Sequence, residues 1–411
     1  MRSLPQIALL LLAIPATLAA QTAPAMTGAP SWLPTMGIYG KFDVYAGYQN
    51  RVNSPGASSV FAMDASGWAG SRLGFTASES LGGNNKINLD LENGYLTDSG
   101  ALANNVILFS RQCWGGFSGD WGELRFGRQN TVQQTQLGNT DPFDGATYGS
   151  FFNNFTGYNS RMDNIFGYRT NNVGGFVIQG MFAPGEQAGM TPNTSKSGLN
   201  FWAFSAEYFN GPLYVLSSFE TQRSANALVS VNSMFEAVTY DFQTVKVYAA
   251  MYRGSNPGSN IGAASFTNGL PTSAGTPAAT GNSVVSAYNN VQGVYYNGYE
   301  LSALAPVTKK LSLGALYGWA KDMDPNRSKT AAGVLGSHND VSQWALIGQY
   351  WATKNVLIYG VVTQMTNKGG ANFKLASGAT VNPNDILTPK AGKNETGAQV
   401  GFCWSFGGKL F

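Results

Sequence analysis

The sequence predicts an all-β fold: a sixteen-stranded antiparallel transmembrane barrel with a long third loop folded into the lumen. Three observations predict it, namely side chains that alternate along the strands, connections that alternate in length, and an unusual composition. Charged residues make up 11% of the chain, aromatic residues 13% and glycines 51 of 411 residues, whereas soluble globular proteins carry about 25% charged residues. The mean hydropathy of -0.12 is nevertheless that of a polar protein. A barrel reconciles these facts, because each strand points alternate side chains at lipid and at water.

The first twenty residues have the layout of a secretory signal peptide. Arg2 precedes an apolar core, which is followed by small residues such as Ala19 and Ala20. Further along the chain there is no run of about 18 apolar residues, so helices are not expected to cross the membrane. The expected divisions are a signal peptide at residues 1–20, a flexible lead-in at 21–35 and the barrel at 36–411.

Net charge and cysteine usage exclude other classes of protein. The formal charge is +3, and without Arg2 it falls to +2, an excess too small to indicate a nucleic-acid partner. Cys113 and Cys403 are the only cysteines. They fall on predicted strands that are not neighbours, so we expect two free thiols. The chain has no CxxC motif and no Cys/His cluster with ligand spacing, so neither a metal nor a cofactor is predicted.

The alternation of side chains is clear in GIYGKFDVYAGYQ, which begins at Gly37. Phe42 and Val44 share one face and Lys41 lies on the other, which is typical of a strand with one apolar side. Similar strands follow as SRLGFTAS from Ser71, KINLDLENGY from Lys86, FSRQCWGGF from Phe109, ELRFGRQ from Glu123, NIFGYRT from Asn164 and GFVIQGMFA from Gly175. The remaining strands begin near Leu199, Leu213, Asn232, Thr244, Val291, Leu311, Val341, Asn355 and Gly397.

Connections between the predicted strands differ in length in a regular way. Every second link is a tight turn such as GGNN, GDWG or the pair Asn210 and Gly211, a strong hairpin signal. The other links are long: residues 50–70, 96–108, 130–163, 185–198, 224–231, 254–290, 322–340 and 367–396. This alternation, with an even strand number, is what an outer-membrane barrel requires. A soluble β-sandwich or a propeller would not separate its loops by length in this way.

The third long connection, residues 130–161, is expected to be ordered and functional. A link of this length without a strand or helix pattern is usually functional or disordered, and its aromatic residues argue against disorder. They are Phe143, Tyr148, Phe151, Phe152, Phe155 and Tyr158. We expect the loop to fold into the lumen and narrow it. Spacing alone leaves an external surface loop open as the alternative.

Five segments are specific in combination: GIYGKFDVYAGY at Gly37, SRLGFTASESLGG at Ser71, NLDLENGY at Asn88, FSRQCWGGFSGDWGELRFGRQ at Phe109 and RMDNIFGYRT at Arg161. In this order they resemble the general diffusion porins of Gram-negative outer membranes, a family of trimeric, sixteen-stranded, non-specific channels. The resemblance covers the first half of the chain well and the rest mainly by strand rhythm. It implies a homotrimer in outer-membrane lipid that lets small hydrophilic solutes and ions diffuse passively, without a cofactor.

In that family, acids on the third external loop face a ladder of basic residues on the barrel wall. The resemblance implies that residues 130–161 are this loop, with Asp141 as its principal acid and Asp144 as a second one. The implied basic wall consists of Lys41, Arg72, Arg111 and Arg169.

Strand parity independently points the same cations into water. Each alternates with residues predicted to lie outward: Lys41 with Phe42, Arg72 with Leu73, Arg111 with Gln112 and Trp114, and Arg169 with Tyr168. Arg125 has lumen parity too and joins the predicted constriction. Arg128 has the parity of Phe126, which is outward, where the family packs one subunit against another. We therefore predict a trimer-interface salt bridge at Arg128.

The predicted constriction carries four wall cations against two loop acids, which predicts a mild preference for anions. Opposed charges across a narrow pore orient dipolar solutes, and an excess of one sign biases ion flow. Further acids with lumen parity could reverse this preference; they are Asp43, Asp90, Glu92 and Glu123.

Three alternatives to a general porin stay open. A substrate-specific channel would carry rows of aromatic residues or a basic track along the lumen, and this sequence shows neither plainly. The aromatic residues of the third loop leave that option open. An outer-membrane barrel hydrolase would need a base held beside a nucleophile. The only histidine, His338, falls in a predicted external loop, so no catalytic residue is predicted. A purely structural or adhesive barrel would lack conductance.

Overall fold

The computed structural model describes residues 34–54, 57–104, 107–156, 160–184, 200–223, 230–255, 295–322, 340–368, 373, 375 and 393–409. The predicted signal peptide, nearly all of the lead-in and His338 lie outside these residues. The strands are β1 (Thr35–Ser54), β2 (Ala57–Ala65), β3 (Arg72–Gly82), β4 (Asn85–Gly94), β5 (Gln112–Gly119), β6 (Gly122–Asn130), β7 (Arg161–Arg169), β8 (Phe176–Ala183), β9 (Phe201–Asn210), β10 (Leu213–Arg223), β11 (Ser230–Asp241), β12 (Lys246–Ser255), β13 (Tyr295–Pro306), β14 (Leu311–Asp322), β15 (Val341–Thr353), β16 (Val356–Asn367) and β17 (Glu395–Lys409). Three short helices, α1 (Val132–Thr135), α2 (Leu137–Thr140) and α3 (Phe151–Phe155), lie between β6 and β7.

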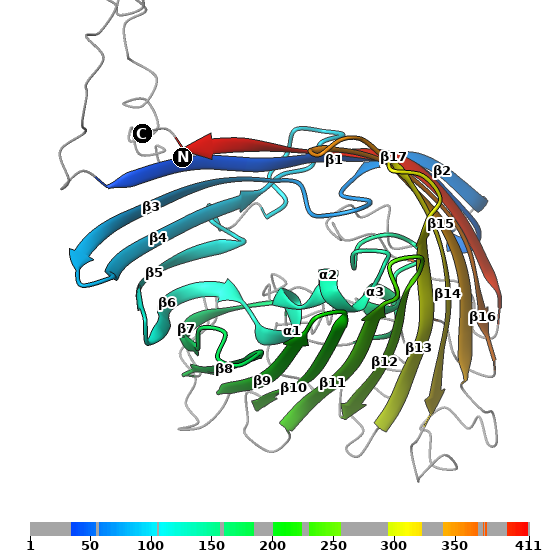
Figure 1. Ribbon diagram of the computed structural model, residues 1–411. Helices are drawn as coiled ribbons and strands as arrows, with labels where there is room; N and C mark the ends of the chain where they lie inside the picture. Colours follow the sequence, from blue (N-terminus) through cyan, green and yellow to red (C-terminus); the bar gives the residue numbers. More distant parts are fainter. Residues whose placement is uncertain are drawn as a thin grey trace, which may run out of the picture. The chain divides into compact units, whose positions relative to one another are not determined.

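The strands form one closed antiparallel sheet (Figure 1). β1 closes it by pairing with β17 from Gly37↔Lys409 to Gln49↔Gly397. β2 and β3 both pair with β1, β3 along its first half and β2 along its second. The strands therefore occupy sixteen positions around the barrel, which confirms the predicted fold.

The first predicted long loop, residues 50–70, is mostly strand, so this part of the prediction is wrong. β1 continues to Ser54, and the chain returns as β2, in register from Val44↔Ala65 to Asn50↔Ser59. Turn-forming residues surround the tip of this hairpin and weaken the local strand signal. Backbone pairing with β1 decides the conformation instead.

Side chains alternate between an apolar outer face and an inner face that is polar along β4 and apolar where the wall packs on the third loop. Ile87 and Leu89 of β4 are exposed on the outer face, whereas Glu92 of the same strand is buried on the inner one. Other outward apolar residues include Phe204, Phe402, Trp404, Leu313 and Leu346. The period of two therefore holds as predicted, because successive Cβ atoms of a strand point to opposite faces.

The predicted parity of β5 is wrong. Gln112 and Trp114 are buried and pair with Glu92 and Asp90, so they share the inner face. Cys113, between them, is exposed. Opposed residues of an antiparallel pair point to the same side, and the acids of β4 therefore fix the orientation of β5.

The described part of the third loop, residues 131–156 and 160, crosses the inside of the barrel from β6 and β7 towards the opposite wall (Figure 1). Phe143, Phe151 and Phe155 are completely buried there. Two glycines make room for the rings, since a Cβ on Gly298 or Gly318 would lie 3.2 Å from Phe151. This packing confirms a loop inside the lumen and excludes the external alternative.

Two further properties concern the described residues only. None of their helices is long and apolar enough to cross a membrane. Both cysteines are free thiols, as predicted, with Cys113 exposed and Cys403 buried.

Candidate functional site

Cationic side chains gather on the inner wall around one carboxylate. Arg111 Nε lies 2.6 Å from Glu92 Oε1, and Arg72 Nη1 lies 3.9 Å from Glu92 Oε2. Arg72 reaches this place from the lumen face of β3, whereas Arg111 lies in a bend just before β5. The structure thus brings Arg111 to the predicted wall by a bend in the chain, not by the strand parity from which we argued.

Arg161, which we did not predict, joins this group. It interacts electrostatically with Glu92, Arg111 and Arg72, and its Nε is buried without a hydrogen-bond partner. It is the first residue of β7, directly after the third loop. One feature of the sequence could have predicted Arg161: in the segment RMDN it is a basic residue at the point where the third loop returns to the barrel wall.

Lys41 completes what we call the cationic cluster: Lys41, Arg72, Arg111 and Arg161. It pairs with Arg72 across β1 and β3, so both side chains point into the lumen. Glu92, buried among the arginines, offsets only one of the four positive charges. The cluster therefore keeps an excess of positive charge.

Asp144 is the acid that faces the cluster. From Thr140 to Ser150 only Asp144 and Gly145 are partly exposed, and Asp144 interacts electrostatically with Lys41 and Arg72. Its backbone has a φ of 55°, a left-handed conformation that Asp tolerates better than most residues. Burial raises the pKa of its carboxyl to about 6, although Lys41 and Arg72 act in the opposite direction.

Asp141, the residue that we ranked first, has a different position. Its carboxylate accepts hydrogen bonds from the Phe143 amide at 2.7 Å, the Phe152 amide at 3.2 Å and the Ser150 hydroxyl. The side chain is buried inside the third loop, and burial raises the pKa of its carboxyl against these hydrogen bonds. Asp141 thus fixes the shape of the loop and does not present its charge to the lumen.

The other acids with lumen parity are engaged locally. Asp43 is buried and accepts hydrogen bonds from the Trp68 and Ala69 amides and from the Tyr359 hydroxyl, at 2.6 to 2.8 Å. Asp90 accepts one from the Tyr39 hydroxyl at 2.8 Å. Hydrogen bonds hold both carboxylates in place, and Asp43 also interacts electrostatically with Lys41, so it offsets part of the charge of the cationic cluster.

Arg125 and Arg169 point into the lumen but lie away from the cluster. Arg125 pairs with Glu123 at 2.6 Å and stacks on Trp114, 4.4 Å from its centroid. Arg169 lies 3.7 Å from Glu207. It ends β7, eight residues from Arg161, which is roughly 26 Å along a strand. Both belong to the wall beyond the cluster, near the short turns.

Arg128 forms an ion pair, but within its own chain. It is only 6% exposed, and its guanidinium donates to the Asp163 carboxylate and, at 2.7 Å, to the Ser110 carbonyl. The register of β6 and β7 shifts beside it, between Gly127 and Gln129. The partner that the structure shows for Arg128 thus lies in its own chain, and the trimer-interface salt bridge stays a prediction.

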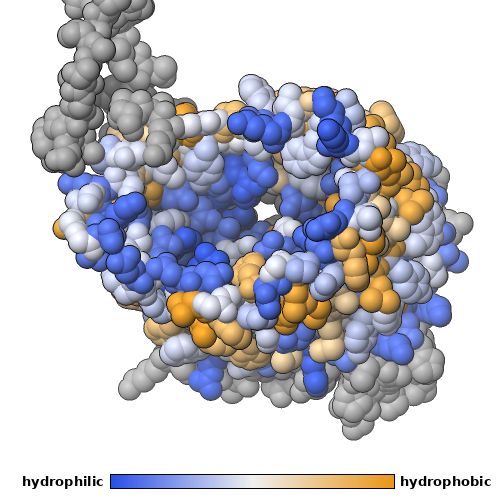
Figure 2. Space-filling model, viewed as in Figure 1, coloured by the Kyte–Doolittle hydropathy of each residue, from blue (hydrophilic) through white to orange (hydrophobic). Residues whose placement is uncertain are grey.

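An opening passes through the barrel beside the third loop, and most residues around it are hydrophilic (Figure 2). The barrel, its inward loop and its hydrophilic opening are together the architecture of a channel. The sequence profile of the Gram-negative porins matches residues 8–370. The chain belongs to this family. The porin is an outer-membrane protein and a passive diffusion channel, since its curated relatives are outer-membrane porins.

Two curated relatives are similar over part of the chain. An outer membrane porin protein of Bordetella pertussis is 28% identical over 263 residues, 57% of this chain and 68% of the relative. Outer membrane porin protein 32 of Delftia acidovorans is 28% identical over 209 residues, 49% of this chain and 58% of the relative. Family and fold are those of a channel rather than an enzyme.

Solved structures share the fold of this porin. The anion-selective porin from Comamonas acidovorans superposes with a TM-score of 0.68 and 22% identity, covering 91% of this chain and 100% of that one. The outer membrane channel DcaP of Acinetobacter baumannii gives 0.57 at 14% identity, covering 91% and 97%. At these identities the likeness extends to the fold alone.

Among the described residues of the porin, no three His, Cys, Asp or Glu side chains come together in a way that could hold a metal ion. The arrangement of Asp144 and the cationic cluster is suited to a transverse electric field instead, because opposite charges face one another across a narrow lumen.

Proposed function

We propose that this porin is a general diffusion channel for small hydrophilic solutes and ions, with a constriction between Asp144 and the cationic cluster that favours anions. The observation that carries the proposal is the charge imbalance there. Four cations, Lys41, Arg72, Arg111 and Arg161, stand against three acids, Glu92, Asp144 and Asp43. A positive potential in a narrow pore raises the local concentration of anions and lowers that of cations.

Three further parts of the proposal concern assembly and export. The apolar outer face would meet outer-membrane lipid, and three copies would form a homotrimer, as in the trimer form of OmpT from Vibrio cholerae. Residues 1–20 would be removed as a signal peptide. The porin would work without catalysis, a cofactor or a nucleic-acid partner.

The reversal potential of single channels in a salt gradient tests this proposal. The refolded mature protein in a planar bilayer is expected to open in plain salt, in steps that occur in threes, with a reversal potential on the anion side. Clear cation selectivity would contradict the assigned charge balance. Current blocked by low concentrations of one solute would indicate a substrate-specific channel, and silence in salt a hydrolase or a structural barrel.

Anion preference is also expected to depend on pH. The pKa of Asp144 is about 6, so its carboxylate is charged above that pH and neutral below it. Lowering the pH through 6 removes a negative charge from the constriction, and the reversal potential should move further to the anion side. Asp144→Asn should show a smaller step, and above pH 6 its preference for anions should exceed that of the wild type. An identical step in that variant would assign the titration to another group.

A further inference from the structure

Two residues of the connection between β16 and β17 lie inside the barrel. Phe373 is 0% exposed and Leu375 is 2% exposed, and both belong to the same apolar cluster as the rings of the third loop. We call this pair the inner strap. No periodic pattern between residues 367 and 396 predicts a buried segment there.

Buried side chains of the wall hold the backbone of the inner strap. Asn367, the last residue of β16, accepts from the Phe373 amide at 2.8 Å and donates to its carbonyl at 3.0 Å. Glu395 of β17 accepts from the Leu375 amide at 2.9 Å, and Gln49 of β1 donates to the Leu375 carbonyl at 2.7 Å. Every backbone polar group of the two residues is thus satisfied.

These bonds make the position of the inner strap specific. Asn367, Glu395 and Gln49 are all buried, and leaving a buried partner of this kind unpaired costs free energy. They come from three adjacent strands, β16, β17 and β1, at the seam where the barrel closes. The inner strap is therefore attached to the wall at a defined place.

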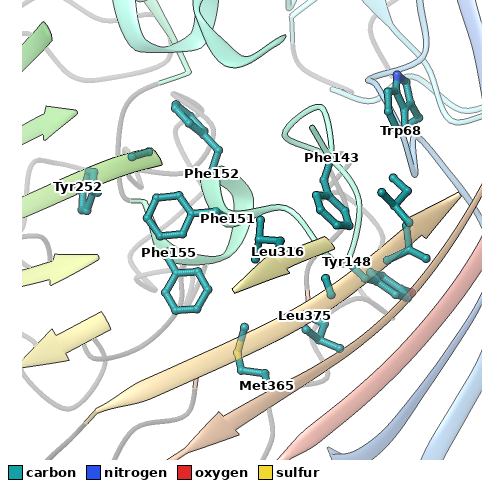
Figure 3. Packing of buried hydrophobic residues seen from close by; sticks show 14 of the residues in the cluster. Trp68, Phe143, Tyr148, Phe151, Phe152, Phe155, Tyr252, Leu316, Met365 and Leu375 are labelled. Atoms are coloured by element: carbon teal, nitrogen blue, oxygen red, sulfur yellow. The ribbon is translucent and has the colours of Figure 1, made fainter. Parts of the chain in front are cut away.

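The side chains of the inner strap pack on the third loop. The Phe373 ring lies 5.7 Å from the Phe155 ring of α3. Leu375 and Tyr148 approach the same point of β17, since a Cβ on Gly397 would lie 2.6 Å from Leu375 and 3.2 Å from Tyr148. Figure 3 shows Leu375, Tyr148 and Phe155 within one continuous apolar cluster.

The inner strap lies where the third loop has no covalent support. The loop leaves β6 and returns to β7, and the far wall supports it only by non-covalent interactions. Examples are the ring contact of Phe152 with Phe235 of β11, 4.9 Å between centroids, and the hydrogen bond from the Tyr148 amide to Gln399 of β17 at 2.7 Å. The inner strap covers the side that faces β16, β17 and β1. Without it, Phe155 and Tyr148 would lose part of their packing on that side.

We propose that Phe373 and Leu375 are positioning residues that hold the third loop at the place where it sets the width and charge of the pore. This inference rests on the proposed constriction, since it adds a second loop segment to the structure that keeps Asp144 opposite the cationic cluster. The inner strap itself carries no charge towards the lumen. It acts through the third loop alone.

Single-channel recording of Phe373→Ala/Leu375→Ala tests the inner strap. We expect more current noise in the open state, closure at lower voltage and a reversal potential closer to zero, because a mobile third loop no longer keeps Asp144 and the cluster at a fixed separation. Phe204→Ala is the matched control, as it removes an aromatic ring from the outer face. A double variant that equals the wild type in noise, closing voltage and reversal potential would overturn the proposal.

A cross-link provides a second test that does not depend on a loss of packing. Phe155→Cys/Phe373→Cys, in a chain with Cys113→Ser and Cys403→Ala, should conduct like the wild type when a thiol-reactive cross-linker that spans the space of the two removed rings joins the cysteines, and should be noisy without the cross-linker. A cross-linked channel that is blocked would show that the contact is absent from the open state, which overturns the proposal. If the wild type is cation-selective but the Phe373→Ala/Leu375→Ala channel is as noisy as expected, the proposed anion preference is wrong and the proposed role of the inner strap stands. A wild type that is silent in salt would overturn both.

Discussion

Replacing Arg72 and Arg161 together by glutamine is expected to abolish the preference of the channel for anions. The two substitutions leave two cations in the cluster, Lys41 and Arg111, against the acids Glu92, Asp144 and Asp43. A unit charge acting at about 4 Å through water is worth about 1 kcal/mol, or roughly a factor of five in local ion concentration. The ratio of anion to cation permeability, measured from the reversal potential, should therefore fall by more than tenfold at low salt and by less at high salt.

The control for this variant removes the same charge elsewhere. Lys310 is exposed in the turn between β13 and β14, where its ammonium donates to the Ala352 carbonyl at 3.2 Å. Two such substitutions at turns, Lys310→Gln with Lys354→Gln, should leave the permeability ratio nearly unchanged, because charges beyond a Debye length of about 10 Å are largely screened. An equal fall in both variants would place the selective charges outside the cationic cluster.

The barrel could be predicted from the sequence because its two determinants are local. The period of two follows from the geometry of any strand, and the alternation of short and long links reflects the two sides of the membrane. Parity failed where the backbone departs from that geometry. Arg111 lies in a bend before β5, and the residues that follow it, Gln112 and Trp114, therefore point inward. Such irregularities depend on pairing with neighbouring strands.

The candidate site was predictable only in outline. Family resemblance supplied the wall positions of Arg72 and Arg111, but it could not rank Asp141 against Asp144, because burial within a folded loop is a tertiary property. Arg161 was missed because it begins a strand at a bulged register. The inner strap was missed because side chains from three strands hold it, one of them at the opposite end of the sequence, and no periodic pattern marks such a segment.

Asp141→Ala is expected to loosen the third loop and to raise the conductance of single channels. The substitution removes one carboxylate that three donors of the loop share, the Phe143 and Phe152 amides and the Ser150 hydroxyl. Leaving buried donors unsatisfied costs about 1 to 3 kcal/mol each. The loop contains only three short helices, so the loss of these hydrogen bonds should loosen it. Conductance should increase and fluctuate, and limited proteolysis should cut the third loop faster than in the wild type.

Asp144→Asn is the matched comparison, because it lies three residues away and removes the same charge. It accepts none of the three hydrogen bonds that shape the loop, so its conductance should stay close to that of the wild type while its reversal potential moves to the anion side. Asp141→Ala should do the reverse and change the conductance more than the reversal potential. If Asp141→Ala instead shifted only the reversal potential, Asp141 would present its charge to the pore. The assignment of Asp141 to the shape of the loop and of Asp144 to the charge of the constriction would then be wrong.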